Sequence, residues 1–458
     1  MNKLLLNICC AFIYKKKNRH HFREKYGKRL SINNNSLRPT TNNDLNTKLI
    51  LDQIKKIDKR TKIIETQLLK QTIHHKTNYK HVFNSNKHIY GDKKYFEIPF
   101  TFGNNKSIEN ILNGTNLEWR NAKFEIIKNG IIFNVGTYSK YGVYCEDLRP
   151  ILSSDISMCS YKIDPNFDNK IRGLKPTYLD EEVVFLGLYT NTYGHCIIGS
   201  MNRLYSLLND KYKDKKVVMI MQKHDENLME IIMLAGINKE KIIKIYPGSS
   251  IKFRSVIIPE WTCYWPTFDI RKDFVRNFDN IRKNIQSEYK YEKIFINRTK
   301  KNGKKVNGKR IFGEGKIENI FKKNGFTIIC PDDYSVMEQV KIFKNCKTLA
   351  GISGSGMHNV VFMEDGATDI VINRGYGCNV NAGIDYYKNN TSFYIMNSII
   401  TANINNAAGA GNAFCFINEN LKNFFDDNEF YYDADDLLFD AEEYIEYANS
   451  EELKNQMF

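Results

Sequence analysis

The sequence lacks the cysteine spacings that would indicate a zinc site or a disulfide framework. Its ten cysteines are scattered over 458 residues, with no C-x-x-C pair and no Cys/His cluster at zinc spacing. We therefore expect free, mostly buried thiols in a reducing compartment.

A long apolar run is missing as well. The opening run, residues 4–14, has eleven mostly apolar residues, well short of the roughly 20 that a membrane-spanning helix needs. A basic cluster at residues 15–29 follows it, whereas a secretory signal places positive charge before its apolar run, so export is not expected. We interpret residues 1–30 as a basic segment that attaches a cytoplasmic protein to the anionic inner face of the plasma membrane; a disordered basic tail is the alternative.

The net charge of +15 is unevenly distributed. Residues 1–30 carry nine Lys and Arg against one Glu, whereas residues 419–458 carry thirteen Asp and Glu against two Lys. The basic middle suits nucleotide diphosphates and anionic lipid as well as nucleic acid. Because no recognised RNA-binding motif appears, a nucleic-acid-binding protein is kept as an alternative and no nucleic-acid partner is expected.

The length predicts two domains, since single hydrophobic cores stop growing near roughly 250–300 residues. Residues 31–80 are interpreted as a linker and a helix with apolar residues at heptad spacing. A coiled coil that joins two copies through residues 45–72 and a single helix packed on the body both remain open.

From about residue 122, short β-rich runs alternate with helical patterns, which indicates parallel α/β structure. The strands are expected at residues 131–135, 182–188, 217–221, 242–246, 255–258, 293–297, 327–330, 348–352, 369–373 and 392–396. The helices are expected at residues 195–208, 226–235, 269–289, 316–324, 335–345 and 357–363. This series divides into domains at 81–265 and 266–400, followed by a return segment and solvated acidic tail at 401–458, and two such units predict a cleft between them.

A glycine-rich turn is the most informative local motif. In TLAGISGSGMHNVVFM, residues 348–363, a buried strand runs into Gly351, Gly354 and Gly356, and a helix begins at once. Its amide groups and helix dipole would suit a diphosphate, although glycines also make ordinary strand-to-helix turns. Asn359 stands where a dinucleotide fingerprint would have a third glycine.

Two further motifs carry candidate chemistry. His195 begins a predicted amphipathic helix with Arg203 eight residues on, so both side chains are expected on one side; a capping or core histidine is the alternative to a general base. Arg298 follows a predicted strand and Arg310 follows a Gly/Lys-rich loop, where arginines could bind phosphate oxygens. A solvated basic loop explains the neighbouring lysines.

In this order the motifs resemble those of glycosyltransferase family 61. The matching residues are Gly194-His195 with Arg203-Leu204, Asn297-Arg298, Arg310, Glu338-Gln339, the loop from Gly351 to Asn359, and Phe362-Met363. The resemblance covers about residues 180–375. It departs from the family at Asn297, Ser353, Ser355 and Met357, where the family has Ser, His, Ala and Leu, and His358 stands at a variable family position.

The resemblance implies a GT-B-like fold of two Rossmann-like domains facing a cleft, here with an N-terminal helical extension. It also implies an inverting, metal-independent glycosyltransferase without a cofactor. The acceptor, a glycan or glycolipid of the cell surface, would bind the first domain, and the nucleotide sugar mainly the second. The donor-binding residues would be Arg298, Arg310, Glu338, Gln339, Ser353, Gly354, Ser355, Gly356, His358 and Asn359.

For the mechanism we expect His195 and Arg203 to be catalytic, with His195 as the base that takes the proton of the acceptor hydroxyl or as a residue that positions the acceptor. An unassigned carboxylate is the alternative base. Arg298, Arg310 and the amides of residues 353–356 would stabilise the departing diphosphate. A metal-dependent GT-A transferase that uses Asp433 and Asp435 is the other alternative.

Overall fold

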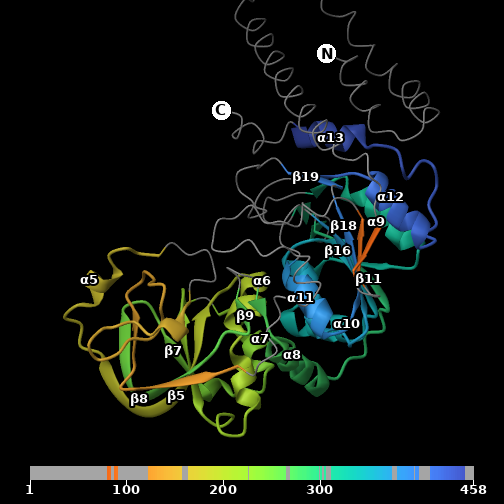
Figure 1. Ribbon diagram of the computed structural model, residues 1–458. Coiled ribbons are helices and arrows are strands. Elements are labelled where there is room, and N and C mark those ends of the chain that lie inside the picture. Colours follow the sequence, from red (N-terminus) through yellow and green to blue (C-terminus); the bar gives the residue numbers. More distant parts are fainter. Residues whose placement is uncertain are drawn as a thin grey trace, which may run out of the picture.

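The computed structural model describes residues 80–83, 87–90, 122–156, 163–224, 226–264, 269–298, 300–301, 304–305, 311–373, 379–396, 398–401 and 413–448. These residues form two α/β bodies, each built on its own sheet (Figure 1). The expected mixed α/β class with parallel sheets is confirmed. The basic segment at 1–30 and the heptad helix at 45–72 lie outside the described residues, so membrane attachment and oligomer formation stay predictions.

The first sheet has six strands in the order β3-β8-β5-β6-β7, with β4 also paired to β8. Its strands are β3 (Phe124–Lys128), β4 (Ile131–Asn134), β5 (Thr177–Tyr189), β6 (Lys216–Met221), β7 (Ile242–Ile245) and β8 (Ser249–Pro259). Strands β5 to β8 are parallel, and β3 and β4 run antiparallel to β8. Because β6 and β7 lie on one side of β5 and β8 on the other, the strand order reverses between β5 and β8.

The second sheet has seven strands in the order β1-β2-β18-β17-β16-β11-β15. Its strands are β1 (Lys80–Phe83), β2 (Lys87–Tyr90), β11 (Lys293–Ile296), β15 (Thr327–Ile329), β16 (Thr348–Ile352), β17 (Thr368–Ile372) and β18 (Thr391–Ile395). All are parallel except the edge strand β1. Here the order reverses between β11 and β16, since β15 lies on one side of β11 and the later strands on the other.

All ten predicted strands are found, with β5 and β8 longer than expected. Strands β1 and β2 differ from the prediction, because residues 81–90 were assigned to the first domain and β2 instead pairs with β18 of the second sheet. A four-residue strand carries no local signal of the sheet that it joins, since that pairing is a long-range contact.

The described helices are α5 (Phe167–Ile171), α6 (Tyr193–His195), α7 (Met229–Met233), α8 (Lys272–Asn284), α9 (Glu314–Lys323), α10 (Val336–Lys344), α11 (Asn379–Tyr387), α12 (Glu419–Asp427) and α13 (Ala441–Ala448). Helix α8 connects the two domains. Its Phe274, Phe278 and Ile281 recur at spacings of four and three residues, lie on one face and are fully buried. Phe278 packs edge-on against Phe362 of the second domain, with ring centroids 5.4 Å apart.

The described C-terminal residues, 413–448, pack on the second domain, whereas the sequence predicts a return segment and a solvated acidic tail over residues 401–458. Strands β14 (Ile311–Phe312), β20 (Ala413–Cys415) and β19 (Ile399–Thr401) form a small sheet. Helix α12 buries Leu421, Phe424 and Phe425, and α13 buries Tyr444 and Tyr447. The acidic residues of α12 and α13 lie on the exposed or half-buried sides of these helices, whereas Asp436 between the helices is buried and pairs with Lys323. A count of charges alone overlooks the buried residues.

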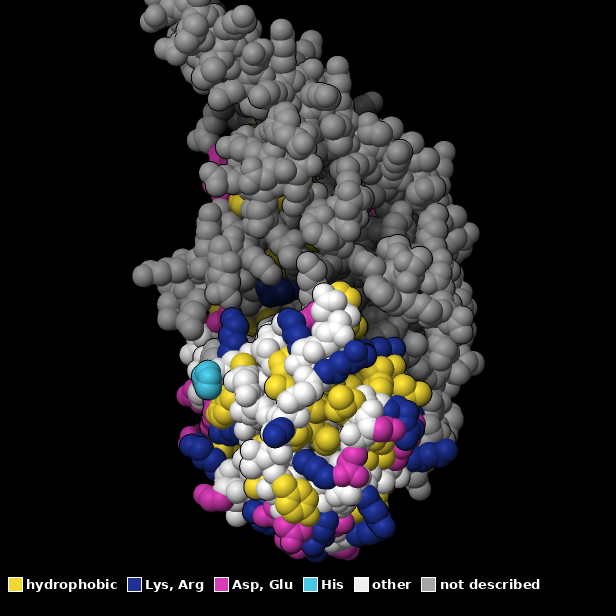
Figure 2. All heavy atoms as spheres, turned by 90° about the vertical axis from the view of Figure 1, so that its left-hand side faces the viewer, with side chains coloured by type: hydrophobic (Ala, Val, Ile, Leu, Met, Phe, Trp, Pro, Cys, Tyr) yellow, Lys and Arg dark blue, Asp and Glu magenta, His cyan; other side chains and the backbone are white. Residues whose placement is uncertain are grey.

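The remaining strands are β9 (Cys263–Tyr264), β10 (Asp269–Ile270), β12 (Lys300–Lys301) and β13 (Lys304–Lys305). The short helices are η3 (Leu152–Ser154), η5 (Cys196–Ser200), η6 (Leu204–Leu208), η7 (Lys239–Lys241), η8 (Pro331–Asp333) and η9 (Ser355–Phe362). No helix within the described ranges is long and apolar enough to span a bilayer. Figure 2 shows the outer side of the first domain, where basic and acidic side chains are interspersed with apolar ones.

Candidate active site at the junction of the two domains

The residues of the predicted motifs follow the carboxyl ends of strands that flank the two points of strand-order reversal. In the first domain β5 ends at Tyr189 and α6 follows with His195. In the second domain Arg298 follows β11, and β16 runs into the glycine turn and η9. We call residues 193–195, 298 and 353–359 together the junction. Figure 1 shows α6 on the side of the first domain that faces the second.

Two of the predicted motifs contact each other directly across the junction. The hydroxyl group of Tyr193 donates a hydrogen bond to Oδ1 of Asn359, 2.5 Å away. A Cβ atom at Gly194 would collide with Oγ of Ser355 and lie only 2.8 Å from its Cβ. Glycine is therefore required for this approach, and the sequence analysis overlooked Tyr193, whose only signal is its place beside the Gly-His pair.

His195 is half-buried at the end of α6. Burial lowers the pKa of its imidazole from the ordinary value of 6.5, so the ring is neutral and able to accept a proton near pH 7. The predicted helix over residues 195–208 is wrong beyond this point, because π-helix η5 and 3₁₀-helix η6 replace it. The side chains of Asn202 and Ser206 donate to the carbonyls of Gly199 and Arg203, three residues back, and compete with a regular α-helix.

The broken helix sends Arg203 into the core of the first domain, so the structure does not bring it beside His195. Its guanidinium group is fully buried and donates to the carbonyl oxygens of Pro259, Ser153 and Asp155 at 2.9, 2.9 and 3.3 Å. It also lies 4.3 Å from the ring centroid of Trp261, and burial lowers its pKa to about 9. These contacts make Arg203 a support for the strand ends rather than a group that reaches a ligand.

Arg298 and the glycine turn form one unit. Nη1 of Arg298 donates to the carbonyl oxygen of Ser353 at 2.7 Å, and its backbone N–H faces the carboxylate of Glu314 at 3.3 Å. Gly354 has φ of +149°, and a Cβ there would lie 2.8 Å from Cζ of Arg298. Only glycine at position 354 leaves room for the guanidinium group. Because of this close contact, Arg298 lies over the start of η9.

The backbone amide groups of the turn differ in their hydrogen-bond partners. The N–H of Ser353 donates to the carbonyl of Ile372 and extends the sheet, so it does not face a ligand. Ser355 and Gly356 begin η9, where amide groups have no intrahelical acceptor and the helix dipole favours an anion. Gly354, Ser355, Gly356, Arg298 and His195 each keep part of their surface exposed.

His358 is buried behind this surface, with 6% of its area exposed. Its Nδ1 lies 3.0 Å from Oδ1 of Asn381, and Nδ2 of Asn381 donates to the carboxylate of Asp369 and to the carbonyl of Met357, both at 3.0 Å. Burial, helped by the positive charge of Arg298 and the nearby imidazole of His195, lowers the pKa of His358 to about 4. Asn381 and Asp369 are not among the residues predicted from the sequence, because they lie 23 and 11 positions from His358 along the chain.

The other predicted donor-binding residues lie in different surroundings. Glu338 accepts a hydrogen bond from the N–H of Ser335 and closes the N-terminus of α10 as a capping box. The Nε2 amide of Gln339 donates to the carbonyls of Pro331 and Tyr334 in the loop after β15. Arg310 lies outside the described residues, so its predicted role stays a prediction.

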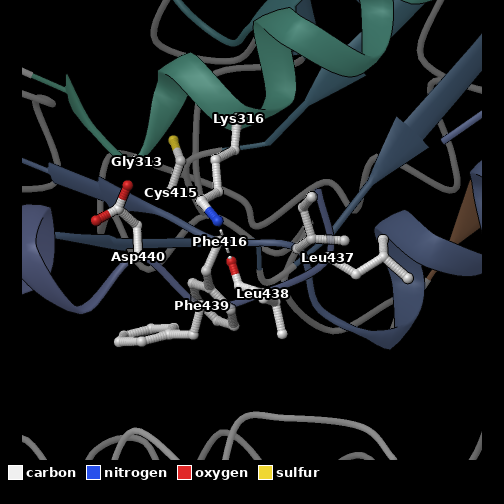
Figure 3. Close-up of a pocket in the computed structure, with 9 residues that line it drawn as sticks. Gly313, Lys316, Cys415, Phe416, Leu437, Leu438, Phe439 and Asp440 are labelled. Carbon is white, nitrogen blue, oxygen red and sulfur yellow. Dashed lines mark hydrogen bonds between the residues drawn. The ribbon is translucent and has the colours of Figure 1, made fainter. Parts of the chain in front are cut away.

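A small pocket lies away from the predicted motifs, between α9 and the C-terminal region (Figure 3). The amino group of Lys316 points into it and donates to the carbonyl of Leu438 at 2.7 Å. Nearby, Asp433, one of the two candidate metal ligands of the GT-A alternative, pairs with Lys323 at 2.6 Å. Within the ranges that the structure describes, no cluster of three or more His, Cys, Asp or Glu side chains could hold a metal ion.

The comparison with family models agrees with the motif order. The family model described as Glycosyltransferase 61 matches residues 193–371, which include α6, β11, the glycine turn and β17 up to Val371. Among solved structures, a glycosyl transferase family 9 protein from Veillonella parvula DSM 2008 is similar over 61% of this chain and 99% of its own, with 12% identity and a TM-score of 0.25. No curated protein matches the sequence.

Proposed function

Because residues 193–371 form a glycosyltransferase family 61 domain, we propose that this glycosyltransferase moves a sugar from a nucleotide sugar to a hydroxyl group of a cell-surface glycan or glycolipid, with inversion and without a metal ion. The acceptor oxygen forms a bond to the anomeric carbon while the bond to the diphosphate breaks. The bonding pair leaves with the diphosphate, and the hydroxyl proton passes to a base. No cofactor takes part.

The diphosphate would bind at the start of η9. Three observations support this position: the strand order of the second sheet reverses there, the amides of Ser355 and Gly356 begin a helix, and the guanidinium group of Arg298 lies over Gly354. Positive charge and fixed N–H donors would offset the charge that develops on the leaving group. The combination of the arginine with the glycine turn carries this proposal.

His195 would be the base, and the first domain would hold the acceptor. Support comes from the direct contact of α6, which ends at His195, with η9, and from a lowered pKa that keeps the imidazole neutral. The proposal includes a GT-B arrangement of the two domains, as the motif order implies, and the two α/β bodies with mainly parallel sheets support it. Attachment to the inner face of the plasma membrane through residues 1–30 belongs to the same proposal.

The first test screens UDP-, GDP- and dTDP-linked sugars for thermal stabilisation of the full chain, followed by transfer assays with the donor that binds. His195→Ala should lower kcat by on the order of a hundredfold or more, because general-base catalysis contributes roughly 10²–10⁴-fold. The anomeric configuration of the product, read by NMR, should be opposite to that of the donor.

His224 provides a matched control, because it stacks on Tyr246 in the first domain, where the two ring centroids are 4.6 Å apart. His224→Ala should leave transfer near the wild-type rate. Full activity of His195→Ala would end the assignment of the base, and loss of activity on chelation, restored by Mn²⁺ or Mg²⁺, would contradict metal independence.

A further inference from the structure

We propose that His358 recognises a hydroxyl group of the transferred sugar, accepting its hydrogen bond at Nε2, and that Asn381 and Asp369 are positioning residues that hold the ring for this purpose. This inference rests on the proposed function and names the part of the donor that His358 contacts.

The orientation of the Asn381 amide fixes the tautomer of His358. The carbonyl oxygen of Met357 can only accept a hydrogen bond, so the group of Asn381 that faces it at 3.0 Å is the NH₂ group. The same NH₂ group donates to the carboxylate of Asp369, also at 3.0 Å. Oδ1 of Asn381 must then face Nδ1 of His358, which therefore carries the proton.

With Nδ1 protonated and the ring neutral, Nε2 is left as a hydrogen-bond acceptor. Within the described residues, Asn381 is the one hydrogen-bond partner of the His358 ring. A ring that is 94% buried and held by a second fixed side chain loses little freedom when it binds a ligand. The structure thus provides a preformed acceptor that nothing else in the described chain uses.

The neighbours of His358 indicate which ligand atom reaches it. His358 lies in η9, three residues after Ser355, and the guanidinium group of Arg298, the proposed diphosphate ligand, lies against Gly354 at the start of that helix. Arg298 and His195, the proposed base, both help to lower the pKa of His358. In a nucleotide sugar, the transferred sugar is the part that lies next to both the diphosphate and the attacking oxygen. Its hydroxyl groups are therefore the donors that come within reach of this acceptor.

Protonation would destroy the acceptor, and the surroundings oppose it. The charged and titratable groups around the ring are Arg298, His195 and, through Asn381, Asp369. Burial together with Arg298 lowers the pKa of His358 to about 4 and outweighs the hydrogen bond to Asn381, which favours the charged form. The ring therefore stays neutral at physiological pH.

Two variants separate the two nitrogens of the ring. His358→Asn keeps an N–H group that can donate to Asn381 but removes the outer acceptor, whereas His358→Gln keeps an oxygen or nitrogen near the Nε2 position. The dissociation constants of the donor sugar nucleotide found in the screen and of the matching nucleoside diphosphate are measured for each protein by calorimetry.

For His358→Asn we expect the nucleotide sugar to bind roughly fivefold more weakly, the loss typical of one hydrogen bond, while the nucleoside diphosphate binds as in the wild type. His358→Gln should lose less affinity for the nucleotide sugar than His358→Asn. Equal weakening of both ligands, or no change in either, would overturn the proposal. If His358→Asn does not fold, Asn381→Ser, which releases the ring, should show the same selective loss.

The outcomes also distinguish this inference from the proposed function. In one outcome, the wild type binds and transfers a sugar, and His358→Asn has the same ratio of dissociation constants for nucleotide sugar and nucleoside diphosphate as the wild type. This outcome would contradict the role of His358 alone. A wild-type protein that binds neither nucleotide sugars nor nucleoside diphosphates would contradict both.

Discussion

Two arginines of the predicted motifs lie in opposite surroundings. Arg203 is enclosed by carbonyl oxygens and aromatic rings within the first domain, whereas Arg298 lies half-buried over the glycine turn. Both use a guanidinium group to bind backbone carbonyls. At the residue scale, what decides their roles is the backbone that carries them, because η5 turns Arg203 inward and the end of β11 presents Arg298 at the sheet edge.

The space for Arg203 depends on Gly187. This residue has φ of +103°, and a Cβ there would lie 2.9 Å from Nη1 of Arg203. Gly187→Ala should lower the free energy of unfolding by about 2–3 kcal/mol, from backbone strain and displacement of the buried guanidinium group. Urea denaturation measures the change.

Gly173→Ala is the control, since Gly173 has φ of +81° but nothing within 4 Å of a Cβ. It should lose about 1 kcal/mol from backbone strain alone. Equal decreases in the free energy of unfolding for the two variants would show that the contact with Arg203 adds nothing to the cost of a side chain at position 187.

At the scale of elements, the contact between α6 and η9 is the feature that joins the two motifs. It consists of the hydrogen bond from Tyr193 to Asn359 and the close approach of Gly194 to Ser355. Asn359 is fully buried, and its NH₂ group donates to the carbonyl of Gly356, which fixes Oδ1 toward Tyr193. The start of η9 and the end of α6 therefore hold one another in place.

Gly194→Ala should disrupt this contact. Its methyl group would collide with the side chain of Ser355 and move His195 relative to η9. Because small displacements of catalytic groups can cost up to about a hundredfold, we expect the transfer rate to fall by on the order of tenfold to a hundredfold. Single-turnover rates with the identified donor measure this change.

The double variant Gly194→Ala with Ser355→Gly should recover part of the rate, since it removes the colliding atoms and keeps the amide of residue 355. Gly315→Ala in α9 is the matched control, because a Cβ there meets nothing within 4 Å and should leave the rate unchanged. No recovery in the double variant would contradict a steric origin.

At the scale of the whole molecule, the two domains share one hydrophobic core. A single cluster of buried residues includes Val184 and Leu186 of the first sheet, Phe278 of α8, and Ile294 and Ile296 of the second sheet. The domains therefore pack through a continuous apolar interior, and acid that disturbs the junction acts on the stability of the whole chain.

Stability should fall in acid partly through His358. Its pKa is about 4 in the folded chain and near 6.5 when unfolded, so between these values the unfolded chain binds a proton that the folded chain does not. The free energy of unfolding should therefore decrease as the pH falls through this window, with a contribution from His358 of about 3 kcal/mol.

Urea denaturation of wild type and His358→Gln from about pH 7 to about pH 4 measures this contribution. The free energy of unfolding of His358→Gln should depend less steeply on pH than that of the wild type. Parallel curves would show that His358 does not resist protonation in the folded chain.

Much of the fold follows from local sequence. Apolar runs such as KVVMIM at β6 and TLAGI at β16 predict buried parallel strands, and both are found. The glycine turn could be recognised because strand, glycines and helix follow one another directly. The turn from β16 into η9 is present at the expected place, although η9 is a 3₁₀-helix rather than an α-helix and begins at Ser355 rather than at residue 357.

The site itself could be predicted only in part. Local patterns identified His195, Arg298 and the glycine turn, which the structure brings together. They also suggested Arg203, which the structure does not bring there, because the side chains of Asn202 and Ser206 bind the backbone of the segment where the helix is expected. Asn381 and Asp369 lie in a helix and a strand whose own patterns only indicate buried structure.

Residues that lie close together in the chain predict ten of the strands, the glycine-lined turn that opens a helix, and an order of motifs similar to that of glycosyltransferase family 61. Three features arise only in the folded chain: β2 joins the second sheet, Tyr193 meets Asn359, and Asn381 orients His358. Such contacts join residues 23 to 305 positions apart, and packing of the whole core selects them rather than any local preference.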